Sequence, residues 1–128
     1  MSEKKKILVV DDDAPIRQLG KKVLEKCGYE VAEAANGTLA LDMIGDLSVY
    51  MPDLIMTDLD YKTPGMNGVN FAREVKKRGY AGPITLGASG VQYVKQDYPD
   101  ADSLFVDYLD KPFLPQRFVE VAKKHLPE

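Results

Sequence analysis

Three short apolar runs in this chain each end in charged residues, and this pattern constrains the fold more than any other feature. Residues 7–10 lead into three aspartates at positions 11–13, and residues 54–57 lead into Asp58. A third run leads into Lys111. Short apolar runs between helical patterns are typical of buried parallel strands, and such folds bind ligands beyond the carboxyl ends of the strands. Carboxylates from two strands and a lysine from a third are therefore expected to converge on one site.

Size, charge and cysteine content narrow the class of protein. With 128 residues, 45% of them apolar and 29% charged, we expect residues 1–128 to form one domain with a conventional hydrophobic core. A net charge of −3 argues against direct binding of nucleic acid, and no apolar stretch is long enough for membrane insertion. The single cysteine, Cys27, excludes an internal disulfide and favours a cytoplasmic location.

Alternating patterns predict five strands, each followed by a helix. The strands are expected at residues 6–10, 30–34, 54–57, 84–88 and 106–109. The helices are expected after Asp13, after Gly37, around residues 69–77, over residues 91–98 and over residues 116–126. Helical crossovers of this length make the strands parallel, with right-handed connections. We therefore expect an α/β fold of three layers, an α/β/α sandwich.

The spacing of apolar residues marks the helix faces expected to pack on the sheet. Leu39, Met43 and Leu47 share one face of the second helix. Cys27, at the end of the first helix, is expected to be buried, and His125, on the last helix, is expected to be solvated.

The predicted carboxylates would repel one another unless a cation lies among them. At an effective dielectric constant of about 20, two unit charges about 4 Å apart interact by roughly 4 kcal/mol. A site made only of oxygen ligands favours Mg²⁺ or a similar hard ion. Lys111 would then neutralise an oxygen of an incoming phosphate, and phosphoryl transfer needs little beyond such positioning. Taken singly, each piece could be only a helix cap, a loop start or surface sequence, so the prediction depends on all three strand ends together.

Four segments contain these charged residues or the patterns around them, namely ILVVDDDAPIR at 7–17, GYEVAEAANGTLAL at 28–41, PDLIMTD at 52–58 and DYLDKPF at 107–113. Together they resemble the receiver domain of two-component response regulators, over essentially the whole chain. The resemblance implies a flavodoxin-like, doubly wound fold with a five-stranded parallel sheet in the order 2-1-3-4-5. It also implies a phosphoacceptor that receives a phosphoryl group, with Mg²⁺ or Mn²⁺, from a sensor histidine kinase or a histidine phosphotransfer protein.

The resemblance implies a role for each charged residue. By position, Asp58 corresponds to the phosphoacceptor and a metal ligand, and Lys111 to the residue that contacts the phosphoryl group. Asp12 corresponds to a direct metal ligand, Asp11 to a ligand that acts through water, and the backbone carbonyl of Asp60 to a further ligand. The peptide bond between Lys111 and the proline after it would be cis.

The loop after Asp58 departs from the family pattern. Receivers usually place a proline four residues and a glycine eight residues after the acceptor, whereas Pro64 and Gly68 lie six and ten residues beyond Asp58. The loop that contains residues 60–63 is therefore two residues longer than the corresponding loop of most receivers. Counting back from Pro64 would make Asp60 the acceptor, but the apolar strand that ends at Asp58 favours Asp58.

The end of the fourth strand departs from the pattern as well. Receivers carry a threonine or serine there whose hydroxyl bonds the phosphoryl group. One alignment puts Gly87 at this position and another puts Ala88, so the hydroxyl is absent unless Ser89 supplies it. Tyr108 matches the aromatic switch residue of the family, or is only a half-buried strand aromatic. Residues 91–104 contribute to the surface that such domains use for signalling.

Three functions are compatible with this sequence. The first is a receiver that is phosphorylated and signals by altered binding to a downstream protein or to an effector domain outside this chain, as a monomer or a phosphorylation-dependent dimer. The second is a pseudo-receiver, which binds partners without phosphorylation. The third is an aspartyl phosphatase of the haloacid-dehalogenase type, whose signature the segment 58–60 resembles. We expect the first, in which the protein catalyses only its own phosphorylation and dephosphorylation and is no enzyme for other substrates.

Overall fold

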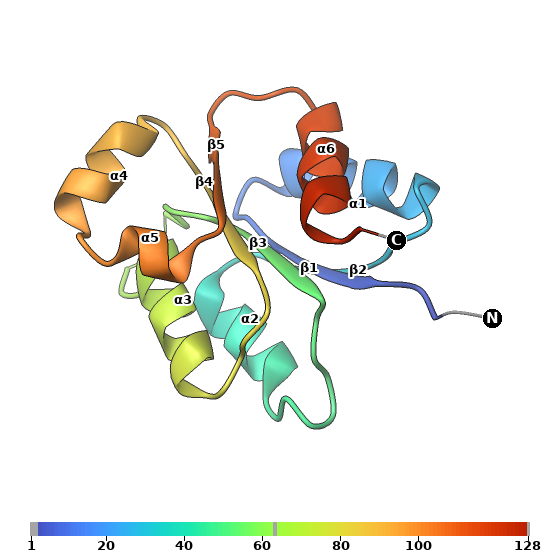
Figure 1. Ribbon diagram of the computed structural model, residues 1–128. Coiled ribbons are helices and arrows are strands. Elements are labelled where there is room, and N and C mark those ends of the chain that lie inside the picture. The colour runs from blue at the N-terminus through green and yellow to red at the C-terminus, as the bar shows by residue number, and fades with distance from the viewer. Residues whose placement is uncertain (1–2, 63, 128) are drawn as a thin grey trace.

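A five-stranded parallel sheet forms the centre of the computed structural model, which describes residues 3–62 and 64–127. The strands lie in the order β2-β1-β3-β4-β5 (Figure 1). Their bounds are Lys6–Val10 for β1, Glu30–Ala34 for β2, Leu54–Asp58 for β3, Ile84–Ala88 for β4 and Asp107–Asp110 for β5. The strand order and the fold class expected from the sequence are confirmed.

Six helices surround the sheet within the described residues. Helices α1 and α6 lie on one face and α2 and α3 on the other, with α4 and α5 beside the β4–β5 edge (Figure 1). Their bounds are Ala14–Lys26 for α1, Gly37–Ile44 for α2, Gly68–Lys77 for α3, Val91–Asp97 for α4, Ala101–Leu104 for α5 and Gln116–His125 for α6. In the part of the chain that the structure describes, no helix has the length and apolar character needed to cross a membrane.

Alternation of side chains along the central strands divides the core into two parts. In β1, Ile7 and Val9 pack with α1 and α6, whereas Leu8 and Val10 pack with α2 and α3. All four side chains are at most 1% exposed, and every residue of β3 is buried. A shift of one residue would exchange the two faces, so this burial holds the register of both strands. The same burial fixes the residues at which β1 and β3 end.

Helix α2 buries a different face from the one predicted. Leu39 and Met43 are 48% and 43% exposed, because α2 packs against the core through Ala40, Leu41 and Ile44 instead. The buried face contains a small alanine, which contributes little to an apolar pattern in the sequence but allows a close approach. The prediction was therefore wrong about which side of this helix faces inward.

Two further predictions about single side chains are wrong. Cys27 is exposed, because α1 ends at Lys26 and Cys27 already lies in the turn that leads to β2. His125 is not freely solvated: its Nε2 lies 3.0 Å from Oδ2 of Asp107, which ties α6 to the start of β5. Both outcomes depend on how a helix end is placed against the sheet, which residue spacing does not reveal.

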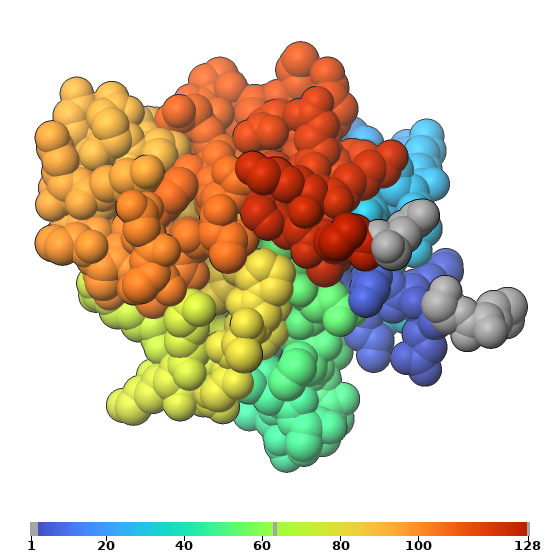
Figure 2. All heavy atoms as spheres, in the orientation of Figure 1, coloured from blue at the N-terminus to red at the C-terminus, as the bar shows by residue number. Residues whose placement is uncertain are grey.

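The segment between β4 and β5 forms two short helices where one was predicted. Pro99 lies between α4 and α5, and a proline lacks the amide hydrogen needed to continue a helix. Helix α5 then buries Ala101 and Leu104 and contacts α3. Together α4 and α5 form one end of the molecule, at the left of the space-filling view (Figure 2).

The N-terminus of α3 packs directly on the end of β3. The Gly68 amide donates a 2.7 Å hydrogen bond to the carbonyl of Leu59. A Cβ atom on Gly68 would overlap the carbonyl oxygen of Asp58 and lie 3.0 Å from Cα of Leu59. Only a residue without a side chain fits here, so Gly68 determines how closely α3 approaches Asp58.

Replacing Gly68 by alanine should lower the free energy of unfolding by about 1–3 kcal/mol, because the added methyl group meets backbone atoms of β3. Urea unfolding followed by circular dichroism measures this difference. Gly87→Ala is the matched control, since a Cβ atom there meets no atom closer than 3.7 Å, and its effect should stay below about 1 kcal/mol. Equal losses in the two variants would contradict the close approach at Gly68.

Candidate functional site

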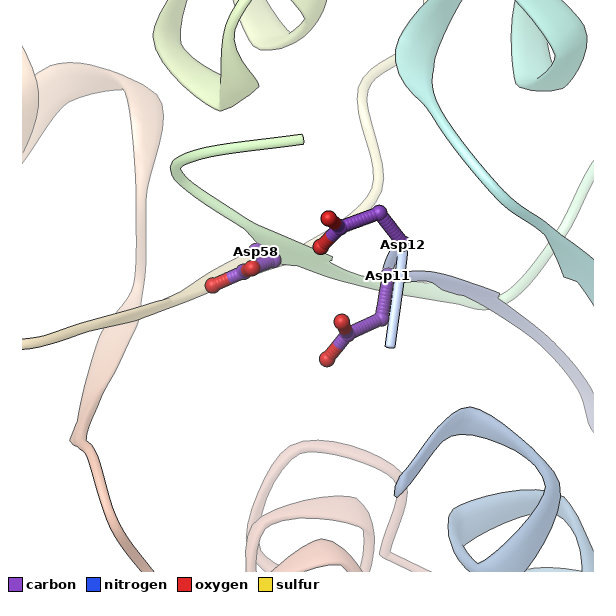
Figure 3. A group of neighbouring side chains, drawn as sticks. All are labelled: Asp11, Asp12 and Asp58. Carbon is purple, nitrogen blue, oxygen red and sulfur yellow. The ribbon is translucent and has the colours of Figure 1, made fainter. Parts of the chain in front are cut away.

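Three of the predicted carboxylates meet at the carboxyl end of the sheet. Asp11 and Asp12 follow β1, and Asp58 ends the neighbouring strand β3. One oxygen of each carboxylate lies within 4.8 Å of the other two (Figure 3). Asp11 and Asp58 are buried, and Asp12 is half-buried. The pairing of β1 with β3 brings these side chains together, as the ends of the two apolar runs predicted.

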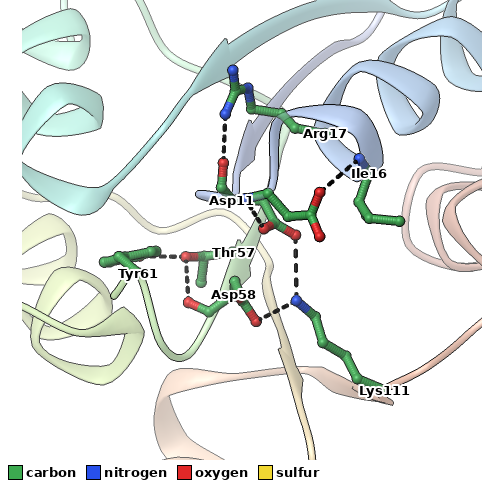
Figure 4. Close-up of polar contacts among 8 residues, drawn as sticks. Asp11, Ile16, Arg17, Thr57, Asp58, Tyr61 and Lys111 are labelled. Atoms are coloured by element: carbon green, nitrogen blue, oxygen red, sulfur yellow. Dashed lines mark hydrogen bonds and ion pairs between the residues drawn. The ribbon is translucent and has the colours of Figure 1, made fainter. Parts of the chain in front are cut away.

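Lys111 reaches the acidic group from the segment that follows β5. Its Nζ lies 2.9 Å from Oδ1 of Asp58 and 3.5 Å from Oδ2 of Asp11 (Figure 4). Its peptide bond to Pro112 is cis, as predicted. The ammonium group of Lys111 therefore bridges the two buried carboxylates. Among the described residues, the carboxylate of Asp12 has no hydrogen-bond or ion-pair partner.

Burial dominates the electrostatics of this group. Burial raises the pKa of Asp58 to about 6, with Asp11 adding to the shift and Lys111 opposing it. Burial also raises the pKa of Asp11, against the opposing effects of the Asp13 amide and Lys111. For Lys111, burial acts to lower the pKa, but the contacts with the two carboxylates prevail and raise it. Three carboxylates facing one lysine leave an excess of negative charge at neutral pH, which is the condition for binding a cation.

Asp58→Asn should stabilise the metal-free protein at neutral pH. A carboxyl group whose pKa is higher in the folded state than in the unfolded state contributes stability below about pH 4, and this contribution is lost as the pH rises through about 6. Asparagine removes this loss, so the variant should gain about 1–3 kcal/mol near pH 8 and much less near pH 4.5. Urea unfolding at both pH values, without divalent metal, measures the gain.

Asp60→Asn is the control for this pH dependence, because Asp60 carries the same formal charge at an exposed position of the adjoining loop. Its free energy of unfolding should follow that of the wild-type protein across the pH range. A difference between Asp58→Asn and wild type that did not vary with pH would contradict the assigned electrostatics.

A buried tyrosine anchors the extended loop after Asp58. Tyr61 is 2% exposed and packs in the core on the α2–α3 side of the sheet. Its hydroxyl forms a hydrogen bond with Oγ1 of Thr57, and Thr57 in turn donates to the carbonyl of Asp58 at 3.0 Å (Figure 4). Because a threonine hydroxyl has one hydrogen, Tyr61 must be the donor to Thr57. The loop is thus connected to the backbone of Asp58.

Asp60 lies outside the acidic group. It is exposed, and its Oδ1 accepts a 2.8 Å hydrogen bond from the amide of Lys62. Its spacing from Pro64 made Asp60 an alternative acceptor in the sequence, whereas no role was predicted for Tyr61 beside it. The available signal was a single aromatic residue within an otherwise polar loop, which is a common feature of loops that return to the core.

Removing the Tyr61 hydroxyl should destabilise the loop anchor. Tyr61→Phe keeps the buried ring and should lower the free energy of unfolding by about 0.5–1.5 kcal/mol, and Thr57→Val should act similarly. A double-mutant cycle measured by urea unfolding should give a coupling energy of about 1 kcal/mol. Tyr93→Phe serves as the control, because Tyr93 is 60% exposed. Additive effects of the two buried substitutions would argue against the hydrogen bond.

The candidate switch residues at the end of β4 lie on different sides of the sheet. Gly87 pairs with Asp58 across the sheet, and a Cβ atom on it would lie 3.7 Å from Cε of Lys111. Ala88 is buried in the core cluster against which Tyr108 packs. Ser89 is exposed. The two alignments therefore name one residue on the Lys111 side and one on the Tyr108 side, and neither carries a hydroxyl.

Tyr108 is half-buried and is held from the side of α4 and α5. Its hydroxyl donates a 2.7 Å hydrogen bond to Oδ1 of Asp102. Nζ of Lys95 lies 4.8 Å from the centre of its ring, and the ring of Phe105 packs edge-on against it at 5.9 Å. The contact with Asp102 depends on α5, a helix that the sequence did not predict.

Comparisons with known proteins agree with this geometry. The family model for the response regulator receiver domain matches residues 7–123. The chain is 36% identical over 122 residues to chemotaxis protein CheY of Thermotoga maritima, and the match covers 94% of this chain and 96% of that protein. It is 38% identical over 122 residues to the phosphate regulon transcriptional regulatory protein PhoB of Pseudomonas aeruginosa, covering 93% of this chain. That match covers 50% of PhoB, so the chain spans about half the length of such relatives.

A solved structure with a similar fold contains a metal. It is the response regulator protein TrrA of Thermotoga maritima in complex with Mg²⁺ and BeF. The two structures superpose with a TM-score of 0.76 at 33% sequence identity, and the match covers 95% of this chain and 99% of the other. Mg²⁺ is also the kind of ion expected at a site built from carboxylate oxygens.

Proposed function

Because this chain belongs to the response regulator receiver family, we propose that Asp58 accepts a phosphoryl group from a phosphohistidine of a sensor histidine kinase or a histidine phosphotransfer protein. The observation that carries this proposal is the convergence of Asp11, Asp12, Asp58 and Lys111 at one end of the sheet. A receiver is a signalling protein of two-component systems rather than an enzyme, so the reaction takes place on the protein itself. Residues 1–128 would act as one receiver unit.

The acidic group suits Mg²⁺, or Mn²⁺ in its place. The three carboxylate oxygens within 4.8 Å of one another are hard ligands, and burial makes their mutual repulsion costly without a cation. Asp12 would be a direct ligand, since its carboxylate has no competing partner among the described residues. Both carboxylate oxygens of Asp11 are engaged, by the amide of Asp13 at 2.9 Å and by Lys111, which fits a contact through water.

The family pattern alone supports the backbone carbonyl of Asp60 as a further metal ligand. The ion, when bound, would offset negative charge on the phosphoryl oxygens and on the carboxylates beside them. The attack on phosphorus and the contact with the new phosphoryl group would depend on side chains of this chain.

Asp58 would supply the nucleophile. One of its carboxylate oxygens attacks the phosphorus atom, so that a P–O bond forms while the P–N bond to the donor imidazole breaks. The imidazole nitrogen leaves with the electron pair and takes a proton from water. A pKa of about 6 leaves Asp58 largely ionised at neutral pH, as the attack requires. Lys111, whose Nζ lies 2.9 Å from Oδ1 of Asp58, would then donate to an oxygen of the new phosphoryl group.

The output would be a change in partner binding. Phosphorylation replaces the single negative charge of the Asp58 carboxylate by a phosphoryl group of about −1.5 to −2 at the end of β3, next to β4 and Lys111. The surface formed by α4, α5 and Tyr108 would carry this change to a downstream protein, to an effector domain or to a second receiver. The match to about half of PhoB is the reason to retain the effector domain as one of these partners. We place the exchange in the cytoplasm, where the exposed thiol of Cys27 would stay reduced.

A pseudo-receiver is the second candidate, and one observation favours it. Neither Gly87 nor Ala88 offers a hydroxyl near Asp58, and the hydroxyl of Ser89 lies on an exposed residue. A protein of this kind would bind partners through the same surface without chemistry at Asp58. The absence of any change in stability with Mg²⁺ and beryllofluoride would favour this second function.

Acetyl phosphate with Mg²⁺ should phosphorylate the wild-type protein on Asp58. Borohydride reduction of the acyl phosphate, followed by peptide mass mapping, identifies the modified residue. Asp58→Asn should abolish the label, because it removes the attacking oxygen, while Asp60→Asn should keep it, because Asp60 lies outside the acidic group. A label that survives in Asp58→Asn but disappears in Asp60→Asn would make Asp60 the acceptor.

A further inference from the structure

Arg17 connects the acidic site to the edge strand of the sheet. From α1, its Nη1 donates a 2.7 Å hydrogen bond to the backbone carbonyl of Asp11 (Figure 4). Its Nε donates to Oε1 of Glu33, in β2, also at 2.7 Å. The Arg17 side chain is only 14% exposed and that of Glu33 is 26% exposed. Two short bonds in different directions hold the planar guanidinium in one orientation.

The carbonyl that Arg17 holds belongs to the peptide between two members of the acidic site. Neighbouring side chains of an extended strand point to opposite faces of a sheet. Asp11 and Asp12 nevertheless each direct a carboxylate oxygen toward Asp58 (Figure 3). The amide of Asp11 still pairs with the carbonyl of Ala34 in β2, at 3.0 Å. The backbone bends at Asp12, directly after the carbonyl that the guanidinium binds.

We propose that Arg17 is a positioning residue for the metal site: it orients the Asp11–Asp12 peptide so that two adjacent carboxylates converge on one divalent cation. Glu33 would hold the guanidinium in place from the other side. The inference rests on the proposed function, because it concerns the same metal site. Groups that orient metal ligands from outside typically change metal affinity by about 10–100-fold when they are removed.

The positive charge of Arg17 and its hydrogen bond to Asp11 would change metal affinity in opposite directions. Its positive charge alone disfavours a cation nearby, so losing that charge would tighten metal binding. Its hydrogen bond to the Asp11 carbonyl keeps the ligands together, so losing that bond would weaken metal binding. Lys21 separates the two effects: it carries the same charge on the same helix and pairs with Glu33 at 3.6 Å, but it makes no hydrogen bond to Asp11.

Mn²⁺ titration of the whole chain, followed by electron paramagnetic resonance, tests the proposal. Arg17→Ala should raise the Mn²⁺ dissociation constant by about tenfold or more, while Lys21→Ala should leave it within about twofold. Arg17→Lys keeps the charge but lacks the planar fork, so it should resemble Arg17→Ala. In the metal-free protein, the NMR amide shifts of Asp12 and Asp13 should move in both Arg17 variants and stay in place in Lys21→Ala.

An unchanged or lower dissociation constant in a folded Arg17→Ala protein would overturn the positioning role, and so would equal losses in Arg17→Ala and Lys21→Ala. Urea unfolding without metal establishes that each variant is folded, and Arg17→Lys provides the same comparison if the alanine variant does not fold. If the wild-type protein failed to bind Mn²⁺ and to accept a label on Asp58, the proposed function itself would fall, together with the inference that rests on it.

Discussion

Two buried carboxylates that face each other are the constraint on which the rest of this site depends. Asp11 and Asp58 lie side by side at the ends of β1 and β3, and Lys111 bridges them at 3.5 and 2.9 Å. Burial still raises the pKa of both carboxyl groups, so one lysine does not offset their cost. The fold tolerates this because both strands are covered on both faces, and slipping either one by a residue would exchange the side chains that pack in the two parts of the core. Core burial therefore stabilises a site that its own charges disfavour.

The surrounding residues act on main-chain carbonyls more than on the carboxylates. Arg17 donates a hydrogen bond to the carbonyl of Asp11. Thr57 donates a hydrogen bond to the carbonyl of Asp58 and accepts one from the Tyr61 hydroxyl. Gly68 lies against the same Asp58 carbonyl, where no side chain fits. These contacts hold the peptides that carry the acidic side chains without taking up the carboxylate oxygens themselves. Such support gives a binding site its geometry without occupying its functional groups.

Local patterns and long-range contacts account for different parts of this structure. The ends of the apolar runs predicted the meeting of Asp58 with Asp11 and Lys111, because strand ends in a parallel sheet share one edge. The buried face of α2 and the exposure of Cys27 were predicted wrongly, since both depend on where a helix rests against the sheet. Helix α5 and its hydrogen bond to Tyr108 also went unpredicted, because a four-residue helix leaves almost no periodic signal.

The sequence by itself determined the strands, the class of fold and the residues that gather at the carboxyl end of the sheet, because alternation, capping and strand ends are local properties. Only the tertiary structure decided what holds those residues in place. Arg17 reaches Glu33 across the packing of α1 on β2, and Tyr61 returns from an extended loop to the core beneath Asp58. Contacts of this kind join residues without any fixed spacing along the chain, so they exist only once the helices and the sheet have packed together.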